Sequence, residues 1–155
     1  VQAKRVHDLI EGELRRSGIA GMRVDIEVIE QADHGALAGE IASLKRAGYR
    51  ISLDDFGTGY ANLASVRSLA PDHLKIDKSF VYEMEDASLR SSLIPQMVSI
   101  ARAVGAKVIA EGIENDAQCE KLLAHGVDYG QGFLFAEPME IKALGAWLHG
   151  VTQEG

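Results

Sequence analysis

Apolar and polar residues follow two periods along the chain, one typical of helices and one typical of strands. Apolar positions at helical spacing over 6–14 and 37–44 run up to a glycine, and a short apolar run then begins near residue 22 and near residue 50. Further apolar runs begin near 73, 107 and 129. Their starts are roughly 22 to 34 residues apart, the length of one strand plus one helix. The pattern predicts an α/β fold of parallel strands joined by helices in right-handed crossovers.

The connecting helices are predicted from the same spacing. One runs through Leu63–Leu69, a longer one covers 89–104, and a third ends at Gly126. Pro95 falls inside the longer pattern, where it either kinks the helix or begins a second helical piece at its first turn. The last strand is predicted over 129–135, YGQGFLF.

Length, composition and charge restrict the class of protein. With 155 residues and 46% hydrophobic content, the chain is expected to fold as one domain. The net charge of −7 and the absence of a basic stripe argue against a DNA or RNA polymer as partner. Cys119 is the only cysteine, which excludes an internal disulfide. No apolar run approaches the roughly 20 residues of a membrane span, so we expect a cytoplasmic segment without membrane contact.

Acidic residues follow the predicted strands, at the ends that open on one face of a barrel. These are Glu27, Asp54, Asp55, Asp77, Glu111 and Glu114. Any one of them read alone is a helix cap or a solvated loop carboxylate. Together they repel one another unless a cation neutralises them, and oxygen-rich sites suit magnesium, manganese or calcium.

Asp54 and Asp55, which are adjacent in the sequence, are the acids for which this repulsion is expected to be strongest. Neighbouring side chains on a strand point to opposite faces, so two like charges crowd together only where the strand ends and the backbone turns. A divalent metal, a lysine or arginine, or a helix N-terminus is expected to stabilise them.

Four motifs in order along the chain resemble those of EAL domains, the bacterial phosphodiesterases that hydrolyse cyclic di-GMP to linear pGpG. They are DDFGTGY at 54–60, LKIDKSFV at 74–81, AEGIEN at 110–115 and QGFLFAEPM at 131–139, preceded by RVDIEVIE at 23–30. The resemblance implies a TIM-like (β/α) barrel. It also implies a homodimer and an upstream sensory or cyclase domain in the full protein. A part of the full protein outside 1–155 could anchor it to a membrane.

Such barrels run to about 250 residues, and the Glu-Ala-Leu segment that gives the family its name does not occur in 1–155. We therefore expect residues 1–155 to be a single EAL domain that lacks its first strands. Either a longer domain supplies those strands, or the segment is a remnant that does not complete the site.

The resemblance also assigns roles to individual residues. It implies a two-metal site for Mg²⁺ or Mn²⁺ on Glu27, Asp54 and Asp55, and a catalytic role for Lys75, Glu111 and Asp77. It implies substrate contacts from Gln131, Glu137 and Pro138, although Glu137 stands where the family commonly has a serine or a basic residue. The loop over the metals is expected to involve Glu30, Gly57, Thr58, Gly59 and Glu114.

Two other functions remain open. A degenerate EAL-type receptor binds cyclic di-GMP without hydrolysis, but the retained acids and Lys75 favour the enzyme. An aldolase-like Schiff-base role for Lys75 is disfavoured, because neighbouring acids raise the pKa of an amine.

Overall fold

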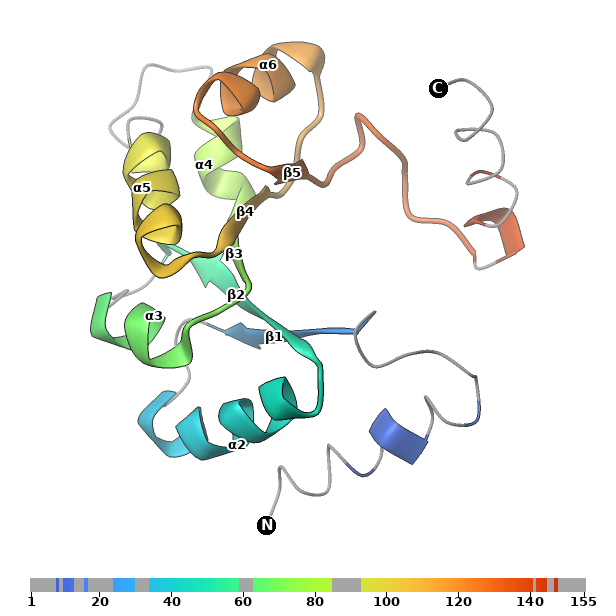
Figure 1. The fold of residues 1–155 in the computed structure, drawn as a ribbon. Helices are drawn as coiled ribbons and strands as arrows, with labels where there is room; N and C mark the ends of the chain where they lie inside the picture. Colours follow the sequence, from blue (N-terminus) through green and yellow to red (C-terminus); the bar gives the residue numbers. More distant parts are fainter. Residues whose placement is uncertain are drawn as a thin grey trace.

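A five-stranded parallel sheet organises the chain (Figure 1). The computed structural model describes residues 24–29, 34–58, 63–84 and 93–140, together with 8, 10–12, 16, 142–144 and 147. The strands are β1 (Asp25–Ile29), β2 (Arg50–Phe56), β3 (His73–Ile76), β4 (Lys107–Ala110) and β5 (Tyr129–Gly130). They lie in the sheet in chain order and every neighbouring pair is parallel, which confirms the predicted parallel α/β arrangement.

The helices between the strands agree with the predicted spacing, with one addition, whereas residues 89–92 of the longer predicted helix and most of the helix predicted over 6–14 lie outside the described residues. The helices between the strands are α2 (His34–Arg46), α3 (Leu63–Leu69), α4 (Lys78–Tyr82), α5 (Ile94–Val104) and α6 (Asp116–Ala124). α4 is too short to show a helical period in the sequence. Pro95 lies in the first turn of α5, so it begins this helix. No helix in the described part of the chain is both long and apolar enough to span a bilayer.

The last strand is shorter than predicted. β5 contains only Tyr129 and Gly130, and residues 133–135 form a turn. Gly132 lies so close to the backbone of Ile113 that a Cβ would be 2.1 Å from the Ile113 oxygen. The Leu134 N–H then donates to that same oxygen at 3.0 Å. After Gly130 the chain therefore contacts the loop around Ile113, which follows β4, instead of continuing along a strand. This contact turns the chain and ends β5.

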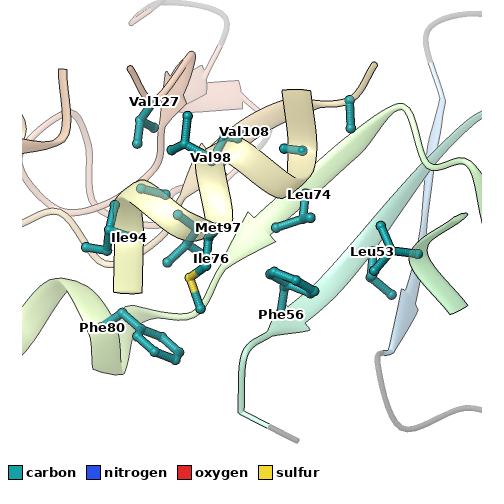
Figure 2. Packing of buried hydrophobic residues seen from close by; sticks show 14 of the residues in the cluster. Leu53, Phe56, Leu74, Ile76, Phe80, Ile94, Met97, Val98, Val108 and Val127 are labelled. Carbon is teal, nitrogen blue, oxygen red and sulfur yellow. The ribbon is translucent and has the colours of Figure 1, made fainter. Parts of the chain in front are cut away.

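The two faces of the sheet differ in chemistry. Ile51, Leu53, Leu74, Ile76 and Val108 alternate along β2, β3 and β4 on the apolar face, and each is at most 1% exposed. Helix α5 contacts β3 and β4, with Met97 and Val98 among the side chains that pack in this core (Figure 2). The residues between these apolar positions face the other way, and they include Ser52, Asp54, His73 and Lys75. The candidate site is therefore built on the polar face.

Candidate active site

Three carboxylates from three different strand ends surround the ammonium group of Lys75. Its Nζ lies 2.7 Å from Glu27 Oε1, 2.9 Å from Asp54 Oδ1 and 2.7 Å from Glu111 Oε1. Glu27 belongs to β1, Asp54 to β2 and Lys75 to β3, whereas Glu111 directly follows β4. We call these four residues the Lys75 cluster. The structure thus brings together four of the predicted site residues at the carboxyl ends of the strands.

The environment of Lys75 keeps it charged. Its side chain is only 7% exposed, and this burial by itself lowers the pKa. The contacts with Glu111, Glu27 and Asp54 outweigh burial and raise the pKa above the ordinary value for lysine. Three ionised carboxylates and one ammonium leave a net charge of −2 in the cluster. A lysine held this way is a donor and a fixed positive charge, while the excess negative charge can attract a further cation.

A bulge in β2 explains how Asp54 and Asp55 are accommodated side by side. Leu53 pairs with Leu74 and Phe56 pairs with Ile76, so β2 has one residue more than β3 over this stretch. Asp55 has a φ of 55°, in the left-handed region. Its carbonyl accepts from the Thr58 N–H at 3.2 Å and from the Thr58 hydroxyl at 2.9 Å. The extra residue interrupts the strict alternation that separates neighbours on a regular strand.

Asp54 has an oxygen without a hydrogen bond. Asp54 Oδ1 is buried and has no hydrogen-bond partner among the residues that the structure describes. It forms an ion pair with Lys75 at 2.9 Å, but the geometry of that contact is not that of a hydrogen bond. A buried carboxylate oxygen that shares its one ammonium partner with two other carboxylates suits a hard divalent cation such as Mg²⁺, Mn²⁺ or Ca²⁺.

The described side chains do not already form a metal cage. Within 24–29, 34–58, 63–84 and 93–140, no three carboxylate, imidazole or thiolate groups converge as a metal-binding set. Glu27 and Asp54 instead contact Lys75. The donor chemistry therefore fits a metal, and the assignment of Glu27, Asp54 and Asp55 as its ligands stays a prediction.

Asp77 has a local structural role. Its Oδ1 accepts from the Ser79 N–H at 2.9 Å and caps the N-terminus of α4. Burial raises the pKa of this carboxyl, but the hydrogen bonds from Ser79 and Lys78 outweigh it and hold the pKa below the usual value. The expected catalytic role of Asp77 remains a prediction beside this observed cap.

A pocket of about 260 Å³ adjoins the Lys75 cluster through Glu111. It is lined by Lys78, Tyr82, Glu111, Gly112, Glu114, Gln131, Gly132 and Phe133. Its size is below the 300–1,000 Å³ of a typical small-molecule site. Gln131 and Glu111 both line this pocket, and the expected substrate contact of Gln131 stays a prediction. Glu137 and Pro138 are exposed and do not line it.

Of the residues expected to support the loop, two can be placed in that loop. Gly57 has a φ of 97°, and a Cβ there would lie 2.1 Å from Met97 Cε and 2.8 Å from Phe80 Cζ. This loop is therefore pressed onto the core. Thr58 is bound to Asp55, as described above. Glu30 and Gly59 lie outside the described residues.

Glu114 contacts a different element. Its Oε1 accepts from the Tyr82 hydroxyl at 2.9 Å, at the end of α4. The sequence interpretation did not identify Tyr82 or three polar residues beneath the site, namely Asp25, Ser52 and His73. Each of these three lies two positions before a site residue on the same strand, and that spacing was the available signal.

The sequence of this chain is similar to those of known proteins. The family model described as "EAL domain" matches residues 1–138. The "Probable cyclic di-GMP phosphodiesterase PdeB" of Escherichia coli (strain K12) is 35% identical over 147 residues, which are 94% of this chain and 28% of that protein.

Solved structures are also similar. One described as "PaMucR Phosphodiesterase, c-di-GMP complex" has a TM-score of 0.83 and 34% identity, over 88% of this chain and 57% of that one. A calcium and cyclic di-GMP complex of Klebsiella pneumoniae BlrP1 has a TM-score of 0.77 and 28% identity, over 84% and 34% of the two chains. The chain thus spans about a quarter of the curated relative and just over half of the first of these structures. The predicted TIM-like fold of the EAL type is confirmed by these neighbours.

Proposed function

The chain belongs to the EAL domain family, and we propose that it takes part in the hydrolysis of cyclic di-GMP to linear pGpG. The observation that carries this proposal is the Lys75 cluster, in which four strand ends contribute a buried ammonium and three carboxylates. Catalytic sites of (β/α) barrels are built in this way, from side chains at the ends of several strands. The names of the similar phosphodiesterases support the same reaction.

The proposal includes a two-metal site for Mg²⁺ or Mn²⁺, held by Glu27, Asp54 and Asp55. The buried Asp54 Oδ1, which shares the Lys75 ammonium with two other carboxylates, and the net negative charge of the cluster support it. The calcium complex of a similar protein is consistent with a hard divalent cation. When bound, a pair of such ions neutralises charge on a phosphodiester and makes water a stronger nucleophile.

The chain's own residues have separate tasks in this proposal. Protonated Lys75 supplies a fixed positive charge near the phosphate and orients Glu111 through the 2.7 Å contact between Nζ and Oε1. Glu111 accepts a proton at its carboxylate from the water that attacks the phosphorus, while the bond from phosphorus to the leaving sugar oxygen breaks and that oxygen takes up a proton from solvent. Gln131, beside Glu111 in the pocket, donates to the substrate. The raised pKa of Lys75 opposes the Schiff-base reading, which requires a neutral amine.

The second candidate is a receptor that binds cyclic di-GMP without cleaving it. The same cluster would then serve recognition alone. In either case we propose a cytoplasmic EAL domain that acts as a homodimer within a longer protein carrying a sensory or cyclase domain.

A product assay tests the proposal. The full-length protein is incubated with cyclic di-GMP and Mg²⁺ or Mn²⁺, and pGpG is quantified by chromatography. We expect Glu111→Gln to lower turnover about a hundredfold, the scale for a lost proton-transfer group. The exposed Glu120→Gln on α6 is the matched control and should leave turnover unchanged.

Calorimetry with Mn²⁺ tests the ligand assignment, with weaker binding expected for Asp55→Asn than for the unmodified protein. Equal affinities would remove Asp55 from the metal site. Binding of cyclic di-GMP with no pGpG under either metal would establish the receptor instead.

A further inference from the structure

A second polar cluster lies beneath the Lys75 cluster on the same face of the sheet. Asp25 of β1 accepts from the Ser52 hydroxyl of β2 at Oδ1, 2.8 Å away, and its Oδ2 lies 2.6 Å from His73 Nδ1 of β3. Ser52 is 1% exposed and His73 is 8% exposed. A single carboxylate, whose own side chain is 35% exposed, therefore links three adjacent strands through two buried partners. We call Asp25, Ser52 and His73 the Asp25 cluster.

The two clusters are offset from each other by two residues on each of the three strands. Asp25 precedes Glu27 by two residues, Ser52 precedes Asp54 by two, and His73 precedes Lys75 by two. Side chains two apart on a strand point to the same face and are roughly 7 Å apart along it. Each member of the Asp25 cluster thus supports, on its own strand, one member of the Lys75 cluster.

The Asp25 cluster does not have the arrangement of a nucleophilic triad. An ionised carboxylate only accepts hydrogen bonds, so the short contact to Asp25 requires a hydrogen on His73 Nδ1. Ser52 Oγ approaches that same nitrogen, at 3.3 Å, and its own hydrogen is directed to Asp25. A general base would need a free imidazole nitrogen facing the hydroxyl. The geometry indicates support for the strands and not chemistry at Ser52.

The strands need such support at this level. The regular pairing of β2 with β3 is interrupted by the bulge between Leu53 and Phe56, directly after Ser52. Asp54 pairs with Ile29 of β1 but, within the bulge, with no residue of β3, so side-chain contacts add to the backbone pairing that places Asp54 near Lys75. A shift of one residue would turn every polar side chain of a strand to the other face.

We propose that Asp25, together with Ser52 and His73, is a positioning unit that fixes β1, β2 and β3 so that Glu27 and Asp54 remain in contact with Lys75. Misplacement of reacting groups by about 1 Å can cost roughly a hundredfold in rate. Loosening this tie therefore lowers turnover without removing any group that touches substrate.

The test uses Asp25→Asn and Ser52→Ala in the full-length protein. Asp128→Asn is the control, because Asp128 also binds a neighbouring strand through the Val108 N–H but lies outside both clusters. The first readout is the NMR signal of the Lys75 ammonium, assigned by its loss in Lys75→Met and recorded well below each melting temperature. It needs neither metal nor substrate. The second is kcat and KM for cyclic di-GMP, which rests on the proposed function.

We expect the Lys75 signal to broaden or shift in Asp25→Asn and Ser52→Ala and to stay unchanged in Asp128→Asn. We also expect kcat to fall about tenfold in Asp25→Asn, with KM within about twofold. An unchanged Lys75 signal in the variants of the Asp25 cluster, or an equal change in Asp128→Asn, would overturn the proposal. If Asp25→Asn does not fold, the Lys75 signal of Ser52→Ala tests the proposal in its place. If the unmodified protein hydrolyses nothing, the proposed function fails and the Lys75 signal still decides this inference.

Discussion

Lys75 and Glu27 are 48 residues apart in the sequence, yet Lys75 Nζ donates to Glu27 Oε1 at 2.7 Å. Their strands are not neighbours, because β1 pairs with β2 and β2 pairs with β3. The contact therefore reaches across β2, where Asp54 meets the same ammonium. One buried positive charge holds together carboxylates from strands on both of its sides.

Removal of that charge should make stability depend on divalent cations. In Lys75→Met the three carboxylates lose their shared partner, and we expect a loss of about 3 kcal/mol at pH 7, the scale for breaking a buried ionic group. Mn²⁺ should then raise the melting temperature of Lys75→Met more than that of the unmodified protein, because a ligand that binds only the folded state stabilises it. Scanning fluorimetry with and without Mn²⁺ measures this. Lys121→Met, at an exposed lysine, is the control, and an equal response of all three proteins to Mn²⁺ would contradict the expectation.

Gly57 should tolerate no side chain. Gly57→Ala places a Cβ on Met97 and Phe80 at a φ of 97°, so overpacking adds to backbone strain and the expected loss is about 2–4 kcal/mol. Gly48→Ala isolates the strain, because Gly48 has a φ of 93° and no atom within 4 Å of the added Cβ. Its expected loss is about 1 kcal/mol. Chemical denaturation of both variants gives the difference, and similar losses would mean that the contact with the core is unimportant.

Asp77 can be tested for two roles at once. Asparagine caps a helix about as well as aspartate, so Asp77→Asn should keep the stability of the protein while Asp77→Ala loses about 1 kcal/mol. Since only the charge differs in Asp77→Asn, a catalytic Asp77 predicts at least a tenfold lower kcat at an unchanged melting temperature. Thermal melts and the product assay are run on both variants. A normal kcat in Asp77→Asn would limit Asp77 to its cap on α4.

Asp128 should contribute stability that disappears in acid. Burial raises the pKa of its carboxyl, but bonds from Lys107, the Val108 N–H and Arg102 outweigh burial and lower the pKa. A group whose folded-state pKa is lowered stabilises the protein above its unfolded-state value, near 3.8, and loses this contribution as the pH falls through the folded-state pKa.

Urea unfolding of the unmodified protein and of Asp128→Asn at pH 7, 5 and 3 measures this contribution. The two proteins should differ by about 1–2 kcal/mol at pH 7 and 5, and the difference should shrink at pH 3. A difference that grows in acid would have the wrong sign.

Local patterns determined much of this protein. The periods of apolar residues placed the strands and helices, because each element buries one face and its spacing repeats along the chain. The order of the acids after the strands placed Glu27, Asp54 and Glu111 near one another, because parallel strands end on the same side of a sheet. Pro95 left a kink and a helix start open as alternatives, and the structure places it in the first turn of α5.

Only the tertiary structure decided which contacts these residues make. The bulge at Asp54 and Asp55 depends on the pairing of β2 with β3, and the early end of β5 depends on the approach of Gly132 to Ile113. The tie between Asp25, Ser52 and His73 joins residues up to 48 positions apart. No period within one segment encodes such contacts, because their free energy arises only when separate strands meet in one register.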